Sequence, residues 1–157
     1  MKKGAIIRDG GKYRYLLWRI WNNYLPLVLW VMLNPSTADE CEDDPTIRRI
    51  IRFSKDWGFG GINVCNLSPY RCTDPKQLKG IPRGVLIPGD NISYMRDAAS
   101  QCSLHVLAYG NPPFPFQKRL LNAIPVQWHY LKLTVHGNPM HPLYLKADLK
   151  PQQIILL

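Results

Sequence analysis

The stretch LPLVLWVML, residues 25–33, is the starting point for interpreting this chain. It is a continuous apolar run with Pro26 near its start and Pro35 just beyond its end. An apolar run of this length between prolines is typical of a central β-strand that is buried on both faces. It is too short to cross a bilayer, which takes about 20 residues. The run therefore predicts the middle strand of a sheet that has helices on both sides.

Strands and helices alternate along the chain after residue 27. Further strands are predicted at GINVCNL (61–67), LHVLAY (104–109) and VQWHYLKL (126–133). Helices are predicted from Pro45 to about residue 57 and at 91–102 and 116–124. Before them, GAIIRDGGKYRYLLWRIW (4–21) predicts a β-hairpin that turns at Asp9-Gly10-Gly11. We expect one α/β domain over residues 1–157, a three-layer sandwich with a mainly parallel central sheet and an N-terminal β-hairpin.

The composition limits the classes of partner and cofactor. Lys and Arg number 20 against 11 Asp and Glu, a formal net charge of +9. This balance favours an anionic partner such as DNA or a nucleotide. None of the four cysteines forms a CxxC pair, and the chain has no Walker loop or GxGxxG, so we expect no metal and no cofactor. Nothing resembles a signal peptide, so we expect a cytoplasmic protein. We also expect no membrane contact, because the longest apolar run is too short to span a bilayer, and no obligate protein partner is evident.

Each predicted strand after residue 27 is followed by polar residues. The polar clusters span residues 34–39, 66–71, 110–111 and 136–144. The carboxyl ends of parallel strands meet at one edge of a sheet, and α/β sheets bind their ligands there. The four clusters therefore predict a single pocket at this edge.

The first two clusters carry candidate ligand-binding groups. Asn34 precedes Pro35, which favours an extended backbone, and its side chain either holds a water or ligand carbonyl or forms an Asx-turn. Ser36 and Thr37 either bind a phosphate or complete the turn. Asn66 repeats the arrangement after the next strand. A carboxamide offers both a donor and an acceptor, which suits the edge of a nucleobase.

Charged residues near the same strand ends suggest catalytic and phosphate-binding roles. Asp44 precedes Pro45 and is predicted to cap the following helix. Asp39 is then the candidate for a general base or a carboxylate that orients water. Arg71 either binds a phosphate through two hydrogen bonds or pairs with Asp39 or Asp44.

The loops at the strand ends also contain a histidine and two aromatic rings of interest. His141, in the loop after the last predicted strand, is suited to donate to a developing anion or to contact a phosphate. Tyr70 and Tyr144 are suited to stack on a base. Asn111 adds a further amide at the end of the third strand of the alternating part.

Four segments resemble a bacterial and phage family of unknown function. They are MLNPSTAD, DDPTIRRIIRF, WGFGGINVCNLSPYRCTDPKQL and HGNPMHPLYL. In the family, the corresponding pattern is LNPSxAD, DPT, GxGxxxVxNLxxxRxTDPxxL and GxPxHPLYL, in this order. The resemblance covers about residues 14–145. One departure is LAYGN, where the family pattern has a Trp before the glycine. The resemblance implies no particular activity.

The layout is also similar to that of the uracil-DNA glycosylase superfamily. Asn34-Pro35 resembles the centre of its G-x-N-P-G motif, which holds the hydrolytic water. Asn66 resembles the asparagine that reads the base, and His141 resembles the histidine of its H-P-S loop. Leu33 and Ser36 stand where that superfamily has glycines, and Leu143 stands in place of its serine.

This second resemblance implies a uracil-DNA-glycosylase-like fold and hydrolysis of the N-glycosidic bond of a uracil-like or modified base in DNA. The base would be flipped out of the helix and would depart with support from a histidine. The candidate catalytic residues are Asn34, Asp39 and His141. The candidate substrate-binding residues are Pro35, Ser36, Thr37, Asn66, Tyr70, Arg71, Asn111 and Tyr144. The alternatives are a non-catalytic nucleic-acid-binding module and an enzyme of modified phage-base or nucleotide metabolism.

Overall fold

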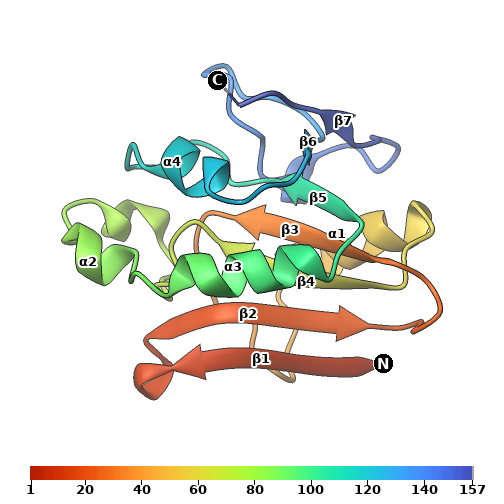
Figure 1. Ribbon diagram of the computed structural model, residues 1–157, viewed down its shortest axis with the longest axis horizontal. Helices are drawn as coiled ribbons and strands as arrows, with labels where there is room; N and C mark the ends of the chain where they lie inside the picture. Colours follow the sequence, from red (N-terminus) through yellow and green to blue (C-terminus); the bar gives the residue numbers. More distant parts are fainter. Residues whose placement is uncertain (157) are drawn as a thin grey trace.

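Seven strands form one mixed sheet in the computed structural model, which describes residues 1–156 (Figure 1). They are β1 (Lys2–Arg8), β2 (Tyr13–Ile20), β3 (Leu27–Met32), β4 (Gly61–Asn66), β5 (Leu104–Leu107), β6 (Trp128–Tyr130) and β7 (Gln152–Gln153). Their order across the sheet is β1-β2-β4-β3-β5-β6-β7. Leu157, the last residue of the predicted domain, lies outside the described residues.

The sheet is parallel in its centre and antiparallel at both sides. Strands β4, β3, β5 and β6 pair in parallel. The hairpin strands β1 and β2 pair antiparallel with each other, and β2 pairs antiparallel with β4. At the other edge, β7 pairs antiparallel with β6. The α/β class is confirmed, but the sheet is mixed rather than mainly parallel, because the hairpin joins it instead of packing beside it.

Helices cover both faces of the sheet (Figure 1). They are α1 (Pro45–Asp56), α2 (Arg83–Leu86), α3 (Asn91–Ser100) and α4 (Gln117–Asn122), with 3-10 turns η1 (Asp9–Gly11), η2 (Pro75–Leu78) and η3 (Pro142–Tyr144). Helix α1 packs on one face through residues such as Ile50, and α2, α3 and α4 pack on the other through residues such as Met95. No helix within residues 1–156 has the length and apolar character needed to cross a membrane.

The central strand is the one that the apolar run predicts. In β3, Val28 and Trp30 face α1, while Leu29 and Val31 face the opposite helices. All four side chains are fully buried, which explains why β3 has no polar alternation. The Trp30 indole Nε1 donates to the Ser54 hydroxyl of α1 at 3.0 Å, so its one polar group is also satisfied.

The N-terminal hairpin is confirmed, and it extends the sheet on the β4 side. Leu17 of β2 lies opposite Val64 of β4, and the strand buries side chains on both faces. The backbone N–H of Arg14 donates to the Pro69 carbonyl just after β4, at 2.9 Å. The start of β2 therefore lies beside the carboxyl end of β4, although the two are about fifty residues apart in the chain.

Candidate functional site

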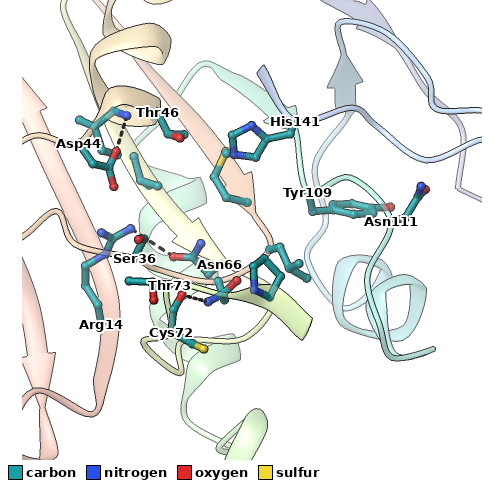
Figure 2. A pocket seen from close by; sticks show the side chains of 16 residues that line it. Arg14, Ser36, Asp44, Thr46, Asn66, Cys72, Thr73, Tyr109, Asn111 and His141 are labelled. Atoms are coloured by element: carbon teal, nitrogen blue, oxygen red, sulfur yellow. Dashed lines mark hydrogen bonds between the residues drawn. The ribbon is translucent and has the colours of Figure 1, made fainter. Parts of the chain in front are cut away.

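A pocket of about 410 Å³ opens at the carboxyl ends of the parallel strands (Figure 2). Its walls come from the start of β2, the ends of β3, β4 and β5, the first turn of α1 and the residue before η3. Each of the four predicted polar clusters contributes a lining residue. Among the candidate residues, those that line it are Asn34, Ser36, Asn66, Asn111 and His141.

Arg14 and Asn66 form a buried polar pair in the pocket wall. They are only 3% and 1% exposed. Arg14 donates from Nη1 to the Ala38 carbonyl at 3.0 Å and from Nη2 to the Asn66 Oδ1 at 3.5 Å. The Arg14 Nε and the Asn66 Nδ2 have no hydrogen-bond partner within residues 1–156. Buried donors are rarely left unpaired, so this wall is suited to a ligand rich in hydrogen-bond acceptors.

The charge of Arg14 persists in this environment. Burial lowers the pKa of the guanidinium to about 10, and the nearby carboxylate of Asp44 opposes that change. Arg14 is therefore cationic at neutral pH. Figure 2 shows Arg14 and Asp44 on one side of the pocket, with Tyr109 and Asn111 on the other.

Asn91, in the first turn of α3, holds the end of β4 in place. Its Nδ2 donates to the carbonyls of Asn66 at 3.1 Å and Leu67 at 3.3 Å, and the side chain is fully buried. These bonds fix the backbone from which the Asn66 carboxamide projects. Asn91 is thus a positioning residue for the pocket.

Asn34 connects the ends of two neighbouring strands. Its Nδ2 donates to the Cys72 carbonyl at 2.8 Å and to the Pro35 carbonyl at 3.2 Å. Pro35 itself is buried, and its carbonyl also accepts from the Cys72 N–H at 3.0 Å. In the described part of the chain, no hydrogen bond occupies the Asn34 Oδ1. The residue therefore has a structural role through its nitrogen and an acceptor available through its oxygen.

The two candidate carboxylates lie in different places. Asp39 does not line the pocket, and its Oδ1 accepts from the backbone N–H groups of Cys41 at 2.9 Å and Glu42 at 2.8 Å. Those hydrogen bonds lower the pKa of Asp39. Asp44 caps α1 as predicted, with Oδ1 accepting from the Ile47 N–H at 2.9 Å, and it also lines the pocket. Of the described residues, Asp44 alone brings a carboxylate to this pocket.

His141 stands at the mouth of the pocket and caps η3. Its Nδ1 accepts from the Leu143 N–H at 3.3 Å, which places the proton of the neutral ring on Nε2. Partial burial lowers the pKa of His141, and the charge of Asp44 opposes this effect. The ring is therefore suited to act as a neutral donor through Nε2–H.

The wall opposite Arg14 is built by residues that follow β5. Burial raises the pKa of Tyr109 to about 12, so its ring stays neutral. The Asn111 Oδ1 accepts from the Thr134 hydroxyl and from the Asn138 Nδ2, each at 2.8 Å. Asn111 thereby ties the end of β5 to the loop that precedes His141.

Besides Pro35 and Asp39, four candidate residues do not line the pocket. Thr37, Tyr70 and Arg71 line a separate cleft next to the pocket. Tyr144 is 90% exposed and lies outside both cavities. The ion pairs within residues 1–156 are Arg19–Asp43 and Arg52–Asp56, so Arg71 pairs with neither Asp39 nor Asp44.

Several lining residues were missed by reasoning from sequence. Besides Arg14 and Asp44, they include Thr46, Cys72, Thr73 and Tyr109. One signal was available for Arg14, because it is one of two arginines in the largely apolar strand YRYLLWRI. Among residues 1–156, no group of three His, Cys, Asp or Glu side chains is arranged to hold a metal ion.

Comparison with curated proteins and with solved structures gives no match for this chain. A family model described as "Protein of unknown function (DUF1643)" matches residues 14–143. The matched range contains every residue that lines the pocket, from Arg14 to His141. It also agrees with the resemblance to a family of unknown function that the sequence motifs indicate. The chain belongs to the DUF1643 family.

Proposed function

We propose that the protein is an enzyme that acts on a nucleobase in DNA and hydrolyses the N-glycosidic bond of a uracil-like or modified base. The observation that carries this proposal is the buried Arg14–Asn66 pair, which lines a pocket at the strand ends and keeps two donors without a partner in the described residues. In this proposal the fold is uracil-DNA-glycosylase-like. The order of Asn34, Asn66 and His141 along the chain supports that assignment.

The size and the lining of the pocket support a base as its ligand. Its volume of about 410 Å³ falls within the usual range for small-ligand sites. The Asn66 Nδ2 and the cationic Arg14 favour a base edge that presents carbonyl oxygens. Met32, Val64 and Tyr109 supply apolar surface for the faces of the ring. A carbonyl-bearing pyrimidine is the base class that fits these groups best.

Asp44 replaces Asp39 as the carboxylate of the proposed reaction. One Asp44 oxygen caps α1, and the other is available to accept a proton from water. The Asn34 Oδ1 is a second free acceptor among the residues that line the pocket. The water oxygen forms a bond to the sugar carbon C1′, the bond from C1′ to the base nitrogen breaks, and the electron pair leaves with the base.

His141 supports the departing base. The Nε2–H of the neutral ring donates to a carbonyl oxygen on which negative charge develops, and Arg14 stabilises the same charge. The net charge of +9 favours binding to the DNA backbone, from which the base is flipped into the pocket.

The test is release of a free base from DNA that contains uracil or a panel of phage-type modified bases, measured by mass spectrometry. We expect release by the wild type and a loss of about 100-fold in Asn34→Ala and in His141→Ala, because each removes a group that acts on the water or the leaving base. Arg119→Gln, on the exposed face of α4, is the matched control and should release base at the wild-type rate. No release across the whole panel contradicts the proposal.

Two other results would assign the protein to a different class. DNA binding that survives Asn34→Ala, without any base release, indicates a non-catalytic nucleic-acid-binding module. Hydrolysis of free nucleotides without any activity on the polymer indicates an enzyme of nucleotide metabolism.

A further inference from the structure

A shallow cleft of about 480 Å³ adjoins the pocket and shares part of its wall. Ser36, Cys72 and Thr73 line both cavities. Figure 2 shows these three residues on the same side as Arg14 and away from Tyr109. The rest of the cleft is formed by Gly11, Thr37, Tyr70, Arg71 and Gln77. A ligand whose base occupies the pocket would therefore have its neighbouring groups at this cleft.

Arg71 presents an unpaired cation to the cleft. Its backbone N–H donates to the Lys12 carbonyl at 2.9 Å, and its Nη1 donates to the Gly11 carbonyl at 3.4 Å. These bonds hold the residue against the η1 turn. The remaining guanidinium N–H groups have no partner in the part of the chain that the structure describes. A guanidinium held in this way is suited to two oxygens of one phosphate.

Three hydroxyl groups add further possible donors to the cleft. The hydroxyls of Ser36, Thr37 and Thr73 make no hydrogen bond with any described residue. No Asp or Glu lines the cleft, so no lining carboxylate competes for the cation. The nearby Asp39 uses its Oδ1 to accept from the N–H groups of Cys41 and Glu42, and it forms no ion pair with Arg71 in the described residues.

We propose that this cleft binds a phosphate group of the nucleotide whose base enters the pocket. Arg71 contacts two non-bridging oxygens, and the hydroxyls of Ser36, Thr37 and Thr73 donate to the same group. The inference rests on the proposed function only in taking the ligand of the pocket to be a nucleotide. The phosphate belongs either to the DNA backbone or to a free nucleotide, and the two sources are distinguished by experiment.

The first measurement uses inorganic phosphate, titrated at constant ionic strength with chloride as the reference anion. Binding is followed by the NMR signal of the Arg71 Nε–H and by the amide signals of Thr37 and Thr73. We expect saturable shifts in the wild type and in Arg119→Gln, which removes the same charge elsewhere. In Arg71→Gln the affinity should fall about tenfold or more, and Arg71→Lys should recover only part of it, because it keeps the charge without the planar fork.

The second measurement repeats the comparison with a mixed-sequence DNA pentanucleotide and with a mixture of the four deoxynucleoside 5′-monophosphates. Arg71-dependent binding of the pentanucleotide alone assigns the cleft to a phosphodiester. Arg71-dependent binding of the monophosphates assigns it to a free nucleotide. If Arg71→Gln, shown to be folded by circular dichroism, binds all three probes as the wild type does, the phosphate cleft is wrong.

The outcomes separate this inference from the proposed function. Arg71-dependent phosphate binding without base release would contradict the proposed reaction and support the phosphate site in the cleft. If Arg71→Gln did not affect base release and no phosphate binding were detected, the phosphate site would be contradicted and the proposed reaction would be supported.

Discussion

Asp39 and Asp44 are close in sequence, but only Asp44 brings its carboxylate to the pocket. Asn is as good a helix cap as Asp, so Asp44→Asn should keep the Ile47 hydrogen bond and change the stability little. It removes the proposed general base, and base release should fall about 100-fold. The measurement is the initial rate of base release, alongside urea unfolding of the same preparation.

Asp39→Ala is the opposite case. It removes the acceptor for the N–H groups of Cys41 and Glu42, so the midpoint of thermal unfolding should decrease. Base release measured well below that midpoint should remain at the wild-type rate. If Asp39→Ala abolished release and Asp44→Asn did not, the assignment of the two carboxylates would be reversed.

His141 makes the stability depend on pH in a defined direction. Burial lowers its pKa in the folded protein, whereas an unfolded histidine has a pKa of about 6.5. As the pH falls through that unfolded value, the unfolded chain binds the proton first, and the free energy of unfolding decreases until the folded pKa is passed.

The readout is the difference between the wild type and His141→Asn, which retains an acceptor before η3. We expect urea unfolding at pH 7 and at pH 5.5 to show a smaller decrease for the variant than for the wild type. An equal decrease in both proteins would mean that His141 is not the group responsible.

The candidate site could be predicted from sequence only where the strand-end rule applies. Asn34 and Asn66 lie at the ends of strands that were recognisable as apolar runs, and His141 lies in the loop after the last predicted strand. Arg14 could not be placed, because its position depends on the pairing of β2 with the distant β4. The different roles of Asp39 and Asp44 depend on the fold of the loop that contains them.

Gly61 marks a place where β4 passes very close to its neighbours. A Cβ at this position would lie 2.8 Å from the Arg19 carbonyl oxygen of β2 and 2.8 Å from the Leu27 Cδ2 of β3. Gly61→Ala should therefore destabilise the protein by about 1–3 kcal/mol, since the sheet must move apart to admit the methyl group. Urea unfolding measures this loss.

Gly84 of α2 is the matched control. Outside its own stretch of backbone, no atom lies within 4 Å of a Cβ built at this position, and alanine is the better helix former. Gly84→Ala should increase the stability by up to about 1 kcal/mol. Equal stability of Gly61→Ala and the wild type would contradict the close approach of β4 to both neighbours.

The elements with strong local signals were predictable, and the short ones were not. The start of α1 at Asp44-Pro45 follows from the preference for Asp and Pro at a helix N-terminus. The burial of Ile47 and Ile50 follows from the 3.6-residue period of a helix with one apolar face. Helix α2 and strand β7 have four and two residues, so they depend on tertiary contacts that no local pattern records. The predicted strand at 126–133 shortens to Trp128–Tyr130 for the same reason.

The net charge of +9 predicts how DNA binding responds to salt. Each phosphate contact releases a counterion, so the affinity for a DNA duplex should fall at least tenfold between 50 and 200 mM salt. Arg71→Gln should reduce the slope of log affinity against log salt by about 1, if the cleft holds a backbone phosphate. Fluorescence anisotropy with a labelled duplex measures both. If no binding were seen at 50 mM salt, the proposal that DNA is the substrate would be contradicted.

The strand order has a consequence for how the protein folds. Strands β2 and β3 follow one another in the chain, yet β4 lies between them in the sheet. Until β4 pairs with them, β2 and β3 each have one edge whose backbone N–H and C=O groups are unpaired. Such edges can pair wrongly with each other or with another chain. Pairing of β4 with β2 also brings Arg14 and Asn66 together, because Arg14 lies in β2 and Asn66 in β4. Ligand binding during refolding would therefore show when β4 has paired with β2 and β3. A nascent chain from which β4 has not yet been synthesised has no complete pocket.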